Sequence, residues 1–139
     1  MAGCGGGERS PSVKALPLVG GSRVIVSQKV CDKGASPYCA VEMVVQDNAY
    51  PNGRALALAE KALLKRRKWR KLNAPVALEW SADSPGDKLR VTYAGAPGEL
   101  QVIDLGWVKR TRRISLALSR EIFAHRAAMS VELQLGTTA

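Results

Sequence analysis

One long helix-forming run, with strand-like segments on both sides, limits the folds that this chain can adopt. From Asn52 to Leu72 the sequence is dominated by Ala, Leu, Lys, Arg and Glu, which all favour helix. Asn52 is a good N-cap, because its side-chain oxygen can accept a hydrogen bond from a free amide of the first turn. The run therefore predicts one main helix in the middle of the chain.

The apolar positions of this run predict its buried face and its end. On a helical wheel the small and apolar side chains form one broad stripe, made of Ala55, Leu56, Leu58, Ala59, Ala62 and Leu63. Arg66 and Arg70 continue the same stripe, and burying an unpaired arginine is costly. We therefore expect the helix to end between Arg66 and Lys68, and the ring of Trp69 to pack onto the core.

Alternating apolar residues predict strands before and after the helix. The candidate segments are 22–30, 41–46, 74–80, 88–94, 100–105 and 130–135. The strand 41–46 is expected to be half-buried, and the turn-rich residues 81–87 are expected to join 74–80 and 88–94 into a hairpin. Residues 116–127 favour a second helix by composition, although the alternation of Ile114, Leu116 and Leu118 also fits a strand. The pattern predicts one α+β domain over 21–136, an antiparallel sheet of about four to six strands with the main helix and a second, C-terminal helix on one face.

Two cysteines lie at the ends of the predicted loop between the first two strands. Across the mouth of a hairpin, Cys31 and Cys39 can lie at disulfide distance. Two free thiols are the alternative. A metal site is disfavoured, because the spacing is not that of a zinc knuckle and the chain has a single histidine, His125. A disulfide favours an oxidising compartment.

Two basic clusters point to anionic partners. The chain has a formal net charge of +9, and its basic residues gather in two runs. The runs are Lys61, Lys65, Arg66, Arg67, Lys68, Arg70 and Lys71, followed by Lys109, Arg110, Arg112 and Arg113. They are either ordinary solvated faces or a surface for anionic lipid, an acidic wall polymer, or nucleic acid stacked on Trp69.

The N-terminal residues resemble a known type of envelope protein. Met1-Ala2-Gly3-Cys4 is similar to the lipobox of bacterial lipoproteins, and the Gly, Ser and Pro residues that follow look like the usual tether over 1–20. The resemblance implies a lipid on Cys4 that anchors the domain to the membrane. Met1 stands where this family usually has Leu, so the resemblance also implies a start upstream of Met1 or a trimmed signal. A cytosolic Gly-rich start with a free Cys4 thiol is the alternative.

The sequence contains no recognisable catalytic motif, and we expect neither a cofactor nor a metal. His125 lies in no nucleophile motif, and the glycines at 5–7 precede no strand–loop–helix unit that would bind phosphate. Asp83 and Asp87 flank a Pro-Gly pair and are interpreted as ordinary turn residues. The first hypothesis is therefore a tethered extracytoplasmic lipoprotein with a binding or scaffolding role. The alternative is a cytosolic nucleic-acid-binding module that uses 61–71 and 109–113.

Overall fold

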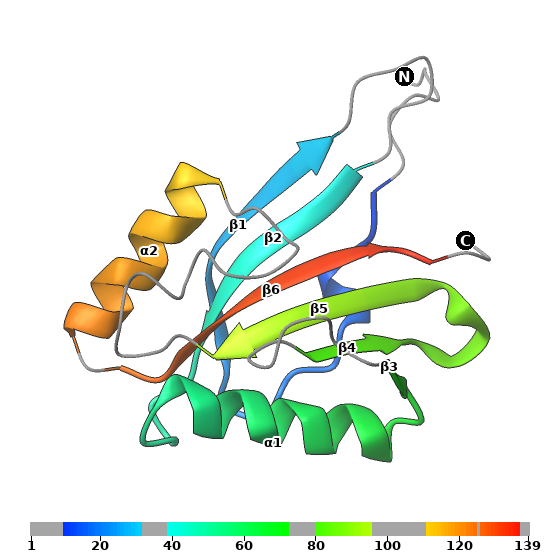
Figure 1. Ribbon diagram of the computed structural model, residues 1–139, viewed down its shortest axis with the longest axis horizontal. Helices are drawn as coiled ribbons and strands as arrows, with labels where there is room; N and C mark the ends of the chain where they lie inside the picture. The colour runs from blue at the N-terminus through cyan, green and yellow to red at the C-terminus, as the bar shows by residue number, and fades with distance from the viewer. Residues whose placement is uncertain (1–9, 32–38, 73–79, 96–110, 125, 137–139) are drawn as a thin grey trace.

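Six strands form one antiparallel sheet in the part of the chain that the structure, a computed structural model, describes: residues 10–31, 39–72, 80–95, 111–124 and 126–136 (Figure 1). The strands are β1 (Arg23–Cys31), β2 (Cys39–Gln46), β3 (Arg70–Leu72), β4 (Trp80–Asp83), β5 (Leu89–Gly95) and β6 (Ala128–Leu135). Their order across the sheet is β1-β2-β6-β5-β4-β3. The helices are α1 (Gly53–Arg66) and α2 (Arg112–Phe123), with short 3-10 turns η2 (Val13–Ala15) and η3 (Pro85–Asp87). The expected α+β class is confirmed.

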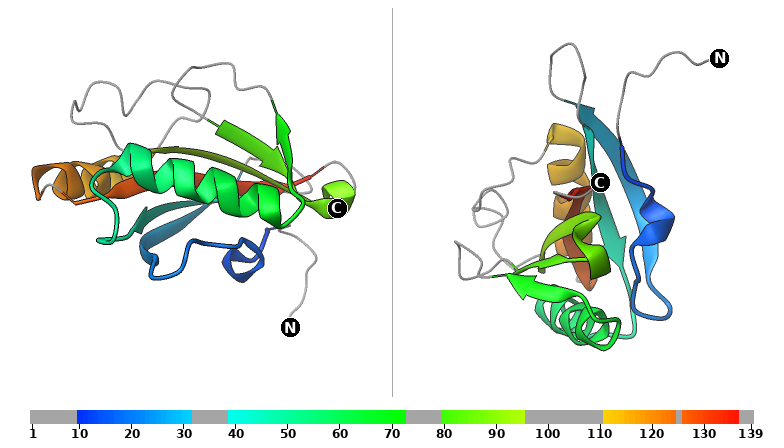
Figure 2. Two further views of the ribbon diagram at one scale, coloured as in Figure 1. Left: turned by 90° about the horizontal axis from the view of Figure 1, so that it is seen from below. Right: turned by 90° about the vertical axis from the view of Figure 1, so that its right-hand side faces the viewer.

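The two helices cover opposite faces of the sheet. Val41, Met43 and Val45 of β2 belong to the large core under α1, whereas Val44 packs with Ile114 and Leu118 of α2. Neighbouring strand residues point to opposite faces, so β2 is covered on both sides. In the right-hand view of Figure 2, α2 and the N-terminal segment flank β2 from opposite sides. The expectation of a half-buried strand with both helices on one face was wrong.

Part of the expected tether belongs to the domain. Leu16 is 5% exposed, and Val13 and Leu18 pack against the same core. The backbone amide of Val19 donates a hydrogen bond to the Glu60 carboxylate of α1, at 3.2 Å. The segment from Val13 onward is therefore a structural cover of the sheet next to α1. Residues 1–9, including Cys4, lie outside the described residues.

The ends of α1 are confirmed, but its buried face is not the expected one. Asn52 caps the helix by accepting from the amide of Ala55, and the helix ends at Arg66. The buried positions are Gly53, Leu56, Ala57, Glu60 and Leu64. Leu58, which the helical wheel placed in the apolar stripe, is 41% exposed. The wheel failed because a charged residue, Glu60, occupies the middle of the buried face.

The segments after α1 differ from the expectation in detail. β3 follows the helix directly, through Lys68 in the left-handed region (φ 68°) and a Trp69 that is 8% exposed and packs in the core, as expected. β4 begins where the expected strand 74–80 ends, and it pairs with β5 in the predicted hairpin. The helix expected at 116–127 begins earlier and ends earlier, as α2. Residues 100–105 and His125 lie outside the described part of the chain.

A disulfide joins the two strands of the first hairpin. Cys31 and Cys39 are bonded, are paired in the β1–β2 register, and have Cα atoms 4.0 Å apart. The structure thus confirms the predicted pairing. Neither described helix combines the length and the apolar character that a membrane crossing requires.

Candidate functional site

A basic pocket opens between the C-terminal half of α1 and strands β3 to β5. Its volume is about 430 Å³, within the range of about 300–1,000 Å³ that is usual for small-molecule sites. The lining residues are Lys61, Leu64, Lys65, Trp69, Lys71, Ser81, Ala82 and Tyr93. Three of them are lysines, and of the described residues that line the pocket none is acidic.

The floor of the basic pocket is apolar because the strands turn one set of alternating side chains toward α1. Lys71 pairs with Ala82 and Trp80 with Tyr93 in the strand register, so these four residues share the face that α1 covers. Leu64 and Trp69 close the floor from the helix side. The floor is therefore built by residues of the main core cluster.

Aromatic rings position one of the three lysines. The Trp80 and Tyr93 rings pack with their centroids 5.9 Å apart. The Lys61 ammonium lies 6.0 Å from the centroid of the Trp80 ring, within the range of a cation–π contact. Lys65 and Lys71 are exposed and reach the pocket from two different elements. The three cations lie near one hollow, where an anion would relieve their mutual repulsion.

A buried carboxyl lies close to the pocket floor. Glu60 is 1% exposed, and its second oxygen, Oε2, has no hydrogen-bond partner among the described residues. Burial raises the pKa of Glu60 to about 7, although the hydrogen bond from the Val19 amide partly opposes the shift. Burial, followed by the negative charge of Glu60, raises the pKa of Tyr93 as well. Tyr93 thus keeps its proton, and its hydroxyl is neutral at physiological pH.

The structure separates the two predicted basic clusters. Arg66, Arg67 and Lys68 are exposed at the end of α1, beside the basic pocket. Arg112 and Arg113 are exposed in the first turn of α2, on the other face of the sheet. Lys109 and Arg110 lie outside the described residues. The cluster on α1 and β3 contributes three lysines to the basic pocket.

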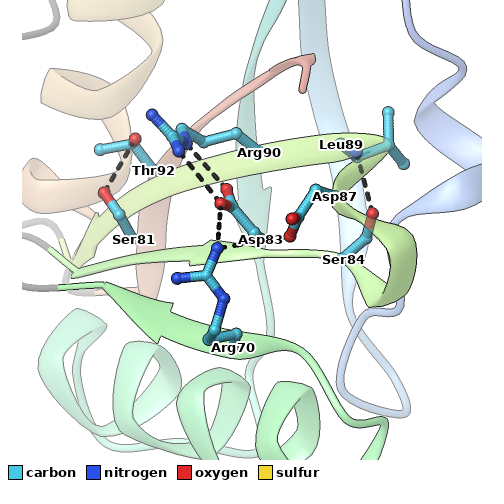
Figure 3. A network of polar contacts seen from close by, with 8 residues as sticks. All are labelled: Arg70, Ser81, Asp83, Ser84, Asp87, Leu89, Arg90 and Thr92. Atoms are coloured by element: carbon cyan, nitrogen blue, oxygen red, sulfur yellow. Dashed lines mark hydrogen bonds and ion pairs between the residues drawn. The ribbon is translucent and has the colours of Figure 1, made fainter. Parts of the chain in front are cut away.

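Arg70 is engaged in an internal network, unlike its basic neighbours (Figure 3). Its Nη2 lies 3.0 Å from Asp83 Oδ2 and 3.3 Å from Asp87 Oδ1. Arg90 donates two more hydrogen bonds to the Asp83 carboxylate, at 2.7 and 3.0 Å. The hydrogen bond from Arg90 is the main cause that lowers the pKa of Asp83. Burial of Asp83, which is 4% exposed, acts in the opposite direction and raises its pKa, but by less. Asp83 is thus a buried ionic centre of β4, and its interpretation as a turn residue was wrong.

We expect Asp83→Asn to lower the free energy of unfolding by about 2 kcal/mol, because it leaves Arg90 and Arg70 without their shared carboxylate. The pKa of Asp83 is depressed in the folded state, so its contribution is present above its unfolded pKa and is lost as pH falls through the folded value. Urea denaturation at pH 7 and pH 3 measures both effects. Asp87→Asn is the matched control, since the Asp87 side chain is 41% exposed and its ion pair is expected to contribute under about 0.5 kcal/mol. Equal losses in the two variants would contradict the central role of Asp83.

Sequence reasoning identified the lysines but missed the floor beneath them. The alternation of Trp80 and Ala82 in one strand placed both residues on one face of the sheet. Adding Tyr93 to that face required the register of the β4–β5 hairpin, in which it pairs with Trp80. Within the described ranges, no three His, Cys, Asp or Glu side chains gather into a metal site. Comparison of the chain with protein-family models, with curated proteins and with solved structures finds no match.

Proposed function

We propose that this chain is a small extracytoplasmic lipoprotein, held at the membrane by a lipid on Cys4, whose basic pocket binds anionic envelope material without catalysing a reaction. The observation that carries the binding role is the convergence of Lys61, Lys65 and Lys71 on one cavity. Lysines placed around a concave surface recognise phosphate or carboxylate groups through charge-assisted hydrogen bonds.

Two features support the extracytoplasmic location. The Cys31–Cys39 disulfide is of the kind that persists in oxidising compartments. The Ala2-Gly3-Cys4 sequence resembles a lipobox, and the Gly-rich residues after it resemble a tether. Since Pro11 is already buried in the domain, only about six residues would separate a lipid on Cys4 from the fold. The domain would then work close to the headgroup layer.

The packing of Trp69 favours this proposal over the nucleic-acid alternative. Sequence-tolerant binding of single-stranded nucleic acid uses exposed aromatic rings on which bases stack. Trp69, the ring in the middle of the basic run, is 8% exposed and belongs to the core. The run thus offers cations around an apolar hollow, and too little of the Trp69 ring is exposed for a base to stack on its face, although its outermost atoms line the pocket.

Co-sedimentation of the full chain with vesicles tests the binding role. We expect binding to vesicles of phosphatidylglycerol and phosphatidylcholine, none to pure phosphatidylcholine, and a steep loss with rising salt. The triple variant Lys61→Gln, Lys65→Gln, Lys71→Gln should weaken binding by about tenfold or more, at roughly 1 kcal/mol for each cation near the surface. An intact mass raised by acylation at Cys4, in protein from its native host, tests the anchor.

A second triple variant controls for net charge. Lys14, Lys88 and Arg113 are exposed on other elements, and their replacement by Gln removes the same three charges. We expect binding to fall far less in this variant than in the pocket variant. If both triple variants lost the same amount of vesicle binding, the effect would come from net charge alone and the pocket would not be the binding site. Tighter binding to a single-stranded oligonucleotide than to vesicles at the same salt would instead support the nucleic-acid alternative.

A further inference from the structure

We infer that the basic pocket binds a single acidic amphiphile, with its phosphate group among Lys61, Lys65 and Lys71 and its apolar chain on the floor formed by Leu64, Trp69 and Ala82. The inference rests on the proposed function and specifies its ligand. A flat cationic surface would be enough to hold a polyanion. This site combines its cations with an apolar hollow, which a purely ionic partner would leave unused.

The charge of the pocket suits a phosphate monoester. A phosphate monoester carries about −1.5 to −2 charges at neutral pH and offers three acceptor oxygens, one for each ammonium group. Lys61 is held over the Trp80 ring, while Lys65 and Lys71 reach the pocket from α1 and β3. Glu60, the acid near the floor, is 1% exposed and is not among the described residues that line the pocket.

The floor supplies the second half of the recognition. Leu64, Trp69 and Ala82 are only 2%, 8% and 4% exposed, so an alkyl chain would cover their outermost carbon atoms together with the methylene groups of the lysine side chains. Each methylene group that is fully buried there contributes about 0.8 kcal/mol. Among the described lining residues, the neutral polar side-chain groups are the Ser81 and Tyr93 hydroxyls and the Trp69 indole N–H, and Ser81 already shares a hydrogen bond with Thr92. The lining thus suits a hydrocarbon chain better than a sugar or a peptide backbone.

Calorimetric titration of the full chain with a series of alkyl phosphates tests the inference without changing the core. We expect affinity to rise with chain length from methyl to decyl phosphate, by about 30-fold or more over the series, and then to level off when the hollow is filled. All ligands are used below their critical micelle concentrations. Decanol, which lacks the charge, and inorganic phosphate, which lacks the chain, should both bind far more weakly than decyl phosphate.

A double variant ties the binding to the pocket. Lys65→Gln with Lys71→Gln should weaken decyl phosphate binding by about tenfold or more, whereas Lys14→Gln with Lys88→Gln should leave it within twofold. Both changes lie at exposed positions, and a thermal melt checks that the fold is kept. Equal binding by the two variants, or an affinity that does not depend on chain length, would overturn the inference.

The alkyl phosphates, together with vesicles, show whether the amphiphile pocket or the whole proposed function fails. Vesicles of phosphatidic acid also show whether the ligand is a membrane lipid or a free amphiphile. Vesicle binding without any chain-length effect would leave the proposed function standing and remove the amphiphile pocket. Loss of both would remove both. If saturating decyl phosphate releases the protein from phosphatidic acid vesicles, the pocket accepts membrane lipid headgroups. If decyl phosphate binds while the protein stays on the vesicles, the pocket's ligand is a free amphiphile.

Discussion

Replacement of Gly95 with alanine is expected to lower the free energy of unfolding by about 3 kcal/mol, at the top of the usual range for overpacking. Gly95 is the last residue of β5 and lies against the first turn of α1. A methyl carbon there would overlap the backbone carbonyl of Gly53 and lie 2.7 Å from the Arg54 amide nitrogen. Neither group is the end of a flexible side chain, so the helix would have to move away from the sheet.

Urea denaturation of Gly95→Ala beside a matched glycine variant measures this effect. Gly20 has an ordinary φ, and no atom of the described residues lies within 4 Å of a carbon added there, so Gly20→Ala should change the stability by less than about 0.5 kcal/mol. An unchanged denaturation midpoint for Gly95→Ala would show that β5 and α1 do not approach this closely.

The second large effect concerns the buried carboxyl of Glu60. Its pKa rises from 4.5 to about 7 in the folded state, so folding favours the protonated form. The resulting contribution to stability is fully present below about pH 4.5 and is lost as pH rises through 7. At 1.36 kcal/mol for each unit, the loss is on the order of 3 kcal/mol.

Glu60→Gln should remove this pH dependence, because the amide keeps an acceptor for the Val19 amide and does not ionise. The measurement is the difference in unfolding free energy between variant and wild type from pH 4.5 to 8.5. It should shift by on the order of 3 kcal/mol in favour of the variant as the pH rises. His125 is present in both proteins, so any contribution from it cancels in the difference. Parallel curves would mean that Glu60 is ionised at little cost in the fold.

The sequence predicted features that depend on local chemistry. The Asn52 cap and the end of α1 near Arg66 followed from side-chain hydrogen bonding and from the cost of burying arginine. The Cys31–Cys39 pair followed from the geometry of a hairpin. Each of these features involves residues close together in the chain, where spacing constrains contact directly.

Features that depend on distant partners were missed. Glu60 is tolerated on the buried face of α1 through the amide of Val19, 41 residues earlier in the chain. In the sequence Arg70 continues the apolar stripe of the main helix, which predicted the end of the helix but not that Arg70 pairs with the Asp83 carboxylate from the short strand β3. The basic pocket needs both the reversal after α1 and the β4–β5 register, so the lysines could be named in advance and their apolar floor could not.

The position of β6 has a consequence for the biosynthesis of the protein. β6 is the last described strand in the chain, yet it lies between β2 and β5 and joins the two halves of the sheet. A chain emerges from the ribosome N-terminal end first, so the inner edges of β2 and β5 stay unpaired until residues 128–135 have been made. The β1–β2 hairpin and the β3–β5 strands therefore cannot join into one sheet until β6 has been made.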